Sequence, residues 1–193
     1  IDETCHINAY TDQEDARLGR DHRGEVILKK FLVPALEKIN PTLPLEAITQ
    51  AVDQLIRDRS NLSLVNANHE AYKLLRDGAN VHIKKNDGTI EVERVKFFDF
   101  DDVSKNHFLC VSQLWIVGEM YTKRPDLVVF VNGIPLILFE LKASHKSLVD
   151  AYRDNLRDYK DTIPKLFWYN MGIIISNGIE NKFGSLTSPF EYF

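Results

Sequence analysis

The chain has 193 residues, of which 44% are hydrophobic and 27% charged, as expected for one globular domain with its own core. Its longest apolar runs fall far short of the roughly 20 residues that cross a bilayer, so the sequence predicts no transmembrane helix. The formal net charge of −4 at pH 7 argues against a free-standing nucleic-acid-binding protein, which usually carries a basic face.

The cysteine content indicates the redox environment of the protein, and the ends of the chain bear on the extent of the sequence. Cys5 and Cys110 are the only cysteines, which is too few for a disulfide framework or a Cys-rich metal site. This favours a reducing, cytoplasmic environment. The chain starts at Ile1 without an initiator methionine and ends at Phe193, so we expect it to be a fragment of a longer protein.

The first 78 residues read as a mainly helical part. Residues 1–22 are polar and irregular. Helical spacing of apolar residues predicts helices at residues 23–39, 45–56 and 67–75. Pro34 is expected to kink or divide the first of these, and Asp77-Gly78 to stop the third.

After Gly78 the pattern changes to strands. Asn86-Asp87-Gly88 predicts a hairpin turn between strand-like runs. The predicted strands are residues 81–84, 90–95, 96–100, 108–117, 127–131, 134–141 and 171–176. A helix is predicted at residues 147–162. This order predicts one α/β domain over residues 1–193, with a helical part at 1–78 and a sheet-containing core at 79–193.

Three charges interrupt the most apolar stretch of the chain, RPDLVVFVNGIPLILFELK at residues 124–142. Side chains alternate between the faces of a strand, so Glu140 and Lys142 point the same way at its end. Two carboxylates, Asp126 and Glu140, beside a lysine suit Mg²⁺, which takes a few protein oxygens and keeps several waters. Lys142 would orient a water or stabilise transition-state charge. The alternative is an ordinary Glu140–Lys142 ion pair with Asp126 in a turn.

The turn between the two strands decides whether Asp126 and Glu140 share a face. A two-residue Asn132-Gly133 loop with regular pairing places the two carboxylates on opposite faces. A three-residue loop with Gly133 in a bulge pairs Phe130 with Ile134 and brings them to one face. Because the metal chemistry needs a shared face, we predict a bulge or an equivalent register shift.

Pro125-Asp126 followed by Glu140-Leu141-Lys142 resembles the PD-(D/E)xK nuclease signature. The whole 124–142 string resembles the N-terminal nuclease region of the R (motor) subunit of type I restriction enzymes. So do AYKLLRDGANV at 71–81, VKFFDFDDVSKNHFLCVSQ at 95–113 and IISNGIENKFGSL at 174–186. The resemblance runs from about Arg23 onward. It implies a PD-(D/E)xK restriction-endonuclease-like core: a central mixed sheet flanked by helices, with an N-terminal helical region.

The resemblance also implies a Mg²⁺-dependent DNA endonuclease domain. Asp126, Glu140 and the backbone carbonyl of Leu141 would be metal ligands, and Lys142 the catalytic lysine. Many relatives carry Gln-x-x-x-Tyr on a helix after the sheet. Asn155 and Tyr159 stand in that arrangement here and share one helical face, which suits contact with DNA or with the active site. The alternative is a boundary Asn and a half-buried Tyr on an amphipathic helix.

Further contacts are assigned to a few charged residues. Some members of the wider superfamily add a glutamate from the first helix, and Glu25 is the candidate here; a solvated helix-start glutamate is the alternative. Lys146 and Arg153 are the candidate DNA-phosphate contacts, while most basic residues nearby interleave with aspartates as a solvated face. Tethering to a DNA-bound motor would raise the local concentration of DNA and offset the acidic net charge.

The implied partners are double-stranded DNA and the methyltransferase and specificity subunits of a type I restriction–modification complex, in a bacterial or archaeal cytoplasm. The sequence contains no GxxxxGK[ST] phosphate loop, so ATP would serve only a motor domain downstream. Two alternatives stay open: a non-catalytic docking domain of the same fold, and a DNA-repair nuclease of the same superfamily.

Overall fold

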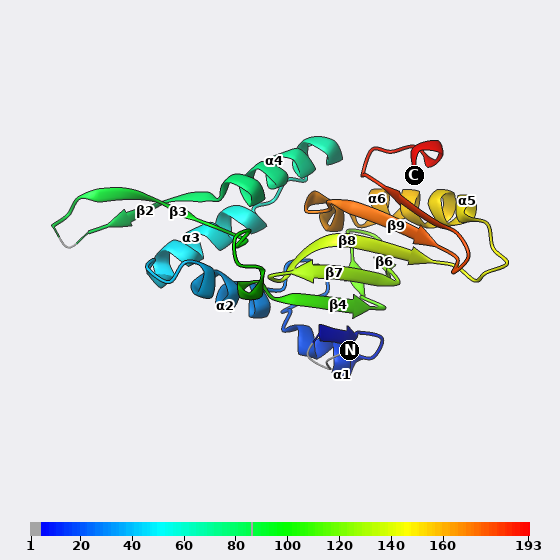
Figure 1. The fold of residues 1–193 in the computed structure, drawn as a ribbon, viewed down its shortest axis with the longest axis horizontal. Helices are drawn as coiled ribbons and strands as arrows, with labels where there is room; N and C mark the ends of the chain where they lie inside the picture. Colours follow the sequence, from blue (N-terminus) through cyan, green and yellow to red (C-terminus); the bar gives the residue numbers. More distant parts are fainter. Residues whose placement is uncertain (1–4, 86) are drawn as a thin grey trace.

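A computed structural model describes residues 5–85 and 87–193, and its centre is a six-stranded sheet (Figure 1). Its strands, in spatial order, are β1 (His6–Asn8), β4 (Phe108–Ser112), β7 (Leu127–Val131), β8 (Ile134–Leu141), β9 (Gly172–Ser176) and β10 (Asn181–Gly184). β1 runs parallel to β4 and β8 parallel to β9, whereas the other neighbours are antiparallel. The sheet is therefore mixed, as the sequence predicted.

Two short sheets and the helices complete the α/β architecture. The short sheets pair β2 (Ala79–Lys84) with β3 (Ile90–Val95), and β5 (Ile116–Val117) with β6 (Thr122–Lys123). The α-helices are α1 (Asp12–Asp15), α2 (Lys29–Ile39), α3 (Leu45–Ile56), α4 (Leu64–Asp77), α5 (Leu148–Asp150) and α6 (Arg157–Thr162). The π-helix η4 (Ala151–Leu156) joins α5 to α6, and 3₁₀ turns lie at η2 (Ala16–Leu18), η3 (Val103–Lys105), η5 (Pro164–Trp168) and η6 (Phe190–Tyr192). In the described part of the chain, no helix has the length and apolar character needed to span a bilayer.

The N-terminal helices follow the predicted pattern with shifted ends. α2 begins at Lys29 rather than at residue 23, because Leu28 N–H bonds to Gly133 O at 2.9 Å and holds the preceding segment against the β7–β8 turn. The predicted division at Pro34 is wrong, since α2 runs through it. Burial of its apolar face offsets the loss of one amide donor. α4 is longer than predicted, and Ser63 caps its first turn.

The β2–β3 hairpin forms as predicted and projects from the rest of the chain (Figure 1, left). Asn86 of its expected turn lies outside the described residues. Gly88, also in that turn, has a φ of 85°.

Three strand predictions are wrong for identifiable reasons. Residues 96–100 form no strand, because side chains occupy their backbone groups: Asn40 bonds Lys96, and Asn132 bonds Phe97 O. The predicted strand at 108–117 breaks after Ser112, where Gln113 has a φ of 55°. Residues 1–22, expected to be irregular, supply the edge strand β1.

A single hydrophobic core joins one face of the sheet to the helices. Val128, Phe130 and Leu138 point into it from β7 and β8, and Glu140 continues the same buried face of β8. Leu156 and Tyr159 line it from η4 and α6. The charged end of β8 is therefore directed at this helical layer rather than at open solvent.

Candidate functional site

The β7–β8 turn sets the positions of the two carboxylates. Asn132 and Gly133 form a two-residue loop with φ values of 51° and 73°, and Val131 pairs with Ile134. Positive φ at both central residues is the type I′ pattern, whose twist matches that of the flanking strands. The predicted three-residue loop and its Phe130–Ile134 pairing are therefore wrong.

The predicted register shift is nevertheless present, further along the hairpin. Phe130 pairs with Pro135 and Val129 with Ile137, which leaves Leu136 as the extra residue of a bulge. Beyond the bulge, Leu127 pairs with Phe139, so Asp126 stands opposite Glu140. One inserted residue thus brings both carboxylates to one side of the sheet.

Asp126 is held by two neighbouring strands. Its Oδ2 accepts a hydrogen bond from the Leu141 N–H at 2.8 Å, and its Oδ1 accepts one from Gln113 Nε2 at 3.3 Å. Gln113 N–H also donates to the Asp126 carbonyl at 2.9 Å. Gln113 was missed by sequence reasoning. Its place directly after a strand that pairs with β7 was the available signal.

Glu140 is buried, with 1% of its surface exposed. Its Oε1 accepts hydrogen bonds from Lys142 Nζ at 2.9 Å and from Asn155 Nδ2, whereas Oε2 is buried without a partner among the described residues. Burial raises the pKa of Glu140, and the negative charge of Asp126 adds to the rise. The bonds from Lys142 and Asn155 oppose it.

The helix after the loop delivers the predicted Asn155 and Tyr159. Asn155 lies in the π-helix η4, a geometry that often occurs at functional sites, and its amide reaches Glu140 despite being shorter than Gln. Tyr159 is buried, and its pKa is raised by burial and then by the negative charges of Glu140 and Asp126. Asn155 and Tyr159 therefore both face Glu140, and their contact with DNA stays a prediction.

Lys146 and Arg153 lie further out. Both side chains are exposed. The Lys146 carbonyl accepts a hydrogen bond from Asn177 Nδ2 at 3.0 Å, which fixes the loop after β8 to the end of β9. The structure brings neither side chain into contact with Asp126 or Glu140, and their assignment to DNA stays a prediction.

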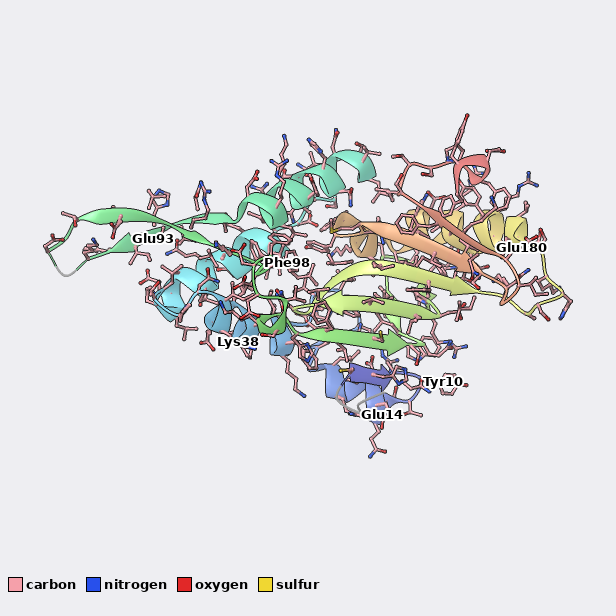
Figure 2. The ribbon with its side chains drawn as sticks, in the orientation of Figure 1. Tyr10, Glu14, Lys38, Glu93, Phe98 and Glu180 are labelled. Atoms are coloured by element: carbon pink, nitrogen blue, oxygen red, sulfur yellow. The ribbon has the colours of Figure 1, made fainter. Side chains whose placement is uncertain are left out.

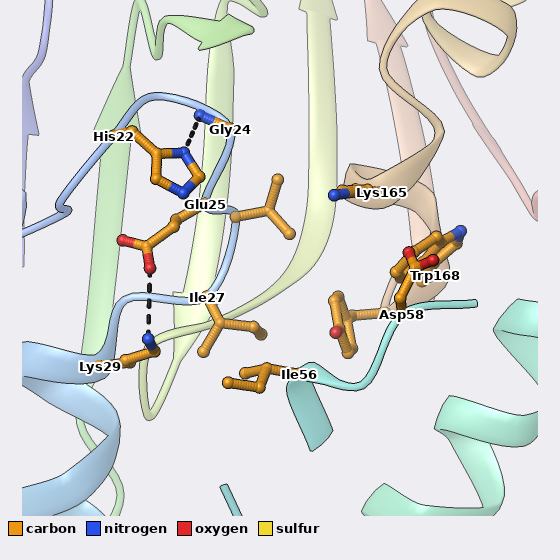
Figure 3. A pocket seen from close by; sticks show the side chains of 11 residues that line it. His22, Gly24, Glu25, Ile27, Lys29, Ile56, Asp58, Lys165 and Trp168 are labelled. Carbon is orange, nitrogen blue, oxygen red and sulfur yellow. Dashed lines mark hydrogen bonds and ion pairs between the residues drawn. The ribbon is translucent and has the colours of Figure 1, made fainter. Parts of the chain in front are cut away.

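Glu25 lies in a separate pocket of about 200 Å³ (Figure 3). Its carboxylate accepts bonds from Lys29 Nζ at 3.2 Å and from the Asp21 N–H at 2.9 Å. Burial alone would raise the pKa of Glu25, but these two donors lower it below its usual value. Within residues 5–85 and 87–193, no interaction joins Glu25 to the acidic pair, so its metal role stays a prediction.

The acidic pair has the chemistry of a hard-cation site. Among the residues that the structure describes, no three His, Cys, Asp or Glu side chains gather to hold a metal by themselves. A divalent ion here would therefore rely on two carboxylates, backbone oxygen and water, which is the sparse ligand set that Mg²⁺ accepts. The buried, unpartnered Oε2 of Glu140 fits such an ion.

Comparison with known proteins gives the family. Residues 2–192 match the model of the type I restriction enzyme R protein N terminus. The HindI endonuclease subunit of a type I restriction enzyme from Haemophilus influenzae is 37% identical over 93% of this chain and 17% of its own length. A protein of Methanocaldococcus jannaschii, provisionally named a type I restriction endonuclease subunit, is 34% identical over 90% of this chain and 17% of its own length.

The chain belongs to the family of type I restriction enzyme R protein N termini, because the family model covers almost all of it. It spans about one sixth of the length of these two curated relatives. The family resemblance read from the sequence is thereby confirmed.

Proposed function

We propose that this chain is a Mg²⁺-dependent endonuclease domain of the PD-(D/E)xK type that hydrolyses DNA phosphodiester bonds. The observation that carries the proposal is the convergence of Asp126, Glu140 and Lys142 at one end of the sheet, where one oxygen of the buried Glu140 carboxylate accepts no hydrogen bond within standard geometry from the described residues. A domain with a purely docking role has no need to bury a carboxylate beside a second one, since like charges raise the cost of ionisation.

In this proposal Asp126, Glu140 and the Leu141 carbonyl hold the metal. When bound, Mg²⁺ would polarise the scissile phosphoryl group and lower the pKa of a bound water. Leu141 N–H and Gln113 orient Asp126, while Asn155 orients Glu140. Tyr159, kept neutral by its raised pKa, closes the helical side of the site.

Lys142 has the freedom that a catalytic lysine needs. Its side chain is 22% exposed and bonds Glu140 through one of three N–H donors. The remaining donors are available to orient the attacking water or to stabilise charge on the transferring phosphoryl group.

The family match favours restriction over DNA repair as the setting. We propose double-stranded DNA as the substrate, and a cytoplasmic assembly with methyltransferase and specificity subunits as the context. ATP would serve a motor domain elsewhere in the parent polypeptide, and the DNA sequence would be recognised by a partner subunit.

Cleavage by the parent assembly tests the proposal. Asp126→Ala, Glu140→Ala and Lys142→Ala are each compared with wild type for Mg²⁺-dependent cleavage of plasmid DNA, with ATP hydrolysis measured in parallel. We expect at least a hundredfold loss of cleavage with ATPase unchanged, since each substitution removes a ligand or a charge-stabilising group. Cleavage at the wild-type rate by all three variants would show that these residues are structural.

A further inference from the structure

Two aromatic rings hold an arginine beside the acidic pair. Arg124 precedes Asp126 by two residues, and its Cζ lies 4.8 Å from the centroid of the Tyr10 ring and 5.0 Å from that of Trp115. Trp115 Nε1–H donates to the Tyr10 backbone carbonyl at 3.0 Å, which ties the Trp115 ring to the Tyr10 backbone. The guanidinium is therefore fixed in position before any ligand arrives.

Within residues 5–85 and 87–193, the Arg124 guanidinium stacks on two aromatic rings and has no hydrogen-bonded or ion-paired acidic partner. The nearby Arg20 and Arg23, by contrast, are both bonded to Asp15. Stacking uses the faces of a guanidinium and leaves its five N–H donors in the plane free, in a fork that matches phosphate oxygens.

The location of this arginine suits an anionic substrate of the acidic site. Tyr10 follows β1, and 56% of the residue is exposed (Figure 2, lower right). Trp115 follows β4 just beyond Gln113, whose side chain bonds Asp126. Because β1 and β4 run parallel, these residues lie at the end of the sheet that carries Asp126.

We propose that Arg124, held by Tyr10 and Trp115, binds a backbone phosphate of DNA next to the phosphodiester bond at the Asp126–Glu140 centre. The inference rests on the proposed nuclease function and adds a substrate-binding residue to that site. The neighbouring phosphate needs a cation of its own, because two carboxylates repel DNA and Lys142, bonded to Glu140, serves the scissile phosphoryl group. Arg124, which has no counter-ion among the described residues, supplies that cation.

A purely structural role predicts a different outcome. If Arg124 only pins the segment around Tyr10 to the sheet, its loss lowers the stability of the fold and leaves DNA affinity unchanged. A phosphate contact instead changes how DNA binding depends on salt, because each contact releases condensed counterions.

The test measures binding of a fluorescein-labelled 20-base-pair duplex to the chain by anisotropy, across salt concentrations and with EDTA present. EDTA separates this test from the nuclease proposal, since binding is then measured without the metal. For Arg124→Ala we expect roughly three- to tenfold weaker affinity at 0.1 M salt, and a slope of log K against log salt reduced by about 0.9. Arg94→Ala, which removes an exposed arginine on β3, is the matched control and is expected to leave both unchanged.

If Arg124→Ala unfolds, Arg124→Lys allows the proposal to be tested in a folded protein. It retains the charge but loses the stacked fork, so we expect the wild-type slope with an intermediate affinity. The proposal would be overturned if both variants show the wild-type slope and the wild-type affinity. If Arg124→Ala unfolds, the wild-type slope and affinity in Arg124→Lys alone would overturn it. So would the absence of any DNA binding by the wild-type chain. If these binding effects appear while Asp126→Ala still cleaves DNA in the parent assembly, Arg124 binds phosphate but the nuclease proposal fails.

Discussion

Glu140 has an energetically costly environment, because its carboxylate is buried opposite that of Asp126. Its pKa is raised, so the folded state favours the protonated form, and the stability it contributes is present below its ordinary pKa of about 4.3 and lost as pH rises through the folded value. At neutral pH the ionised carboxylate therefore depends on Lys142 and Asn155. A structural role alone leaves this cost unexplained, whereas the proposed cation would offset it.

A double-mutant cycle measures this dependence. Lys142→Ala leaves the Glu140 charge without its main partner, so we expect the free energy of unfolding at pH 7 to fall by about 1–3 kcal/mol. Glu140→Gln removes the buried charge and is expected to cost less, and in that background Lys142→Ala becomes nearly neutral. Urea denaturation of the four proteins in EDTA gives the coupling energy. Strictly additive losses would contradict the account.

The half-buried His107, which lies outside the acidic pair, predicts a change in stability with pH. Its ring stacks on Phe31 at a centroid distance of 5.0 Å, its Nδ1 is buried without a partner among the described residues, and burial lowers its pKa. The unfolded state then binds more protons near neutral pH. The stability that the neutral ring contributes is present above about pH 6.5 and lost as pH falls through the folded pKa.

The expected result is that wild type loses stability relative to His107→Phe between pH 7.5 and pH 5.5. Urea titrations of both proteins at the two pH values measure it, and the five shared histidines cancel in the difference. An unchanged difference between the two proteins would show that His107 does not titrate abnormally.

At the scale of secondary-structure elements, the register of the β7–β8 hairpin determines whether Asp126 and Glu140 lie on the same side of the sheet. A metal site shared by Asp126 and Glu140 requires a register shift in this hairpin. The sequence predicted such a shift but not its position. Asn132-Gly133 is a strong signal for a two-residue turn. Pro135 was the available local signal for the bulge at Leu136, because proline cannot donate a ladder hydrogen bond and occurs within sheets mainly at edges and bulges.

Gly133, in the turn of this hairpin, is expected to tolerate substitution poorly. Its φ is 73°, and a Cβ there would lie 2.4 Å from the Leu28 carbonyl oxygen. We expect Gly133→Ala to lower the free energy of unfolding by roughly 2–4 kcal/mol. Gly88→Ala is the matched control, since φ is 85° but no atom lies within 4 Å of the added Cβ, and about 1 kcal/mol is expected. Equal losses in urea denaturation would show that backbone conformation, rather than the contact with Leu28, accounts for the effect.

Helices and strands were predictable where local pattern and tertiary packing agree. α3, β7 and β8 were located to the residue and β9 to within one residue, whereas α4 extends beyond its predicted range at both ends. The failures share one cause, which is that partners distant in sequence set the backbone. Asn40 and Asn132 take the hydrogen-bonding groups of residues 96–97, and β1 forms only because β4 is available to pair with it.

At the scale of the whole molecule, candidate functional residues from distant parts of the sequence lie together at one end of the sheet. Tyr10 follows β1, Gln113 follows β4, Asp126 precedes β7, and Glu140 is the penultimate residue of β8. The motif in residues 124–142 predicted the acidic pair and Lys142. It could not predict Gln113 or the aromatic setting of Arg124, because strand order alone brings those residues to it.

A metal-binding measurement shows whether Asp126 and Glu140 form a metal centre. Titration of Mn²⁺, as a spectroscopic substitute for Mg²⁺, into the chain by electron paramagnetic resonance compares wild type with Asp126→Asn, Glu140→Gln and the exposed control Glu180→Gln. We predict that wild type and Glu180→Gln bind the ion alike, and that each of the other two variants binds at least tenfold more weakly, because each loses an ionised ligand. Equal binding by all four proteins would contradict a metal centre at Asp126 and Glu140.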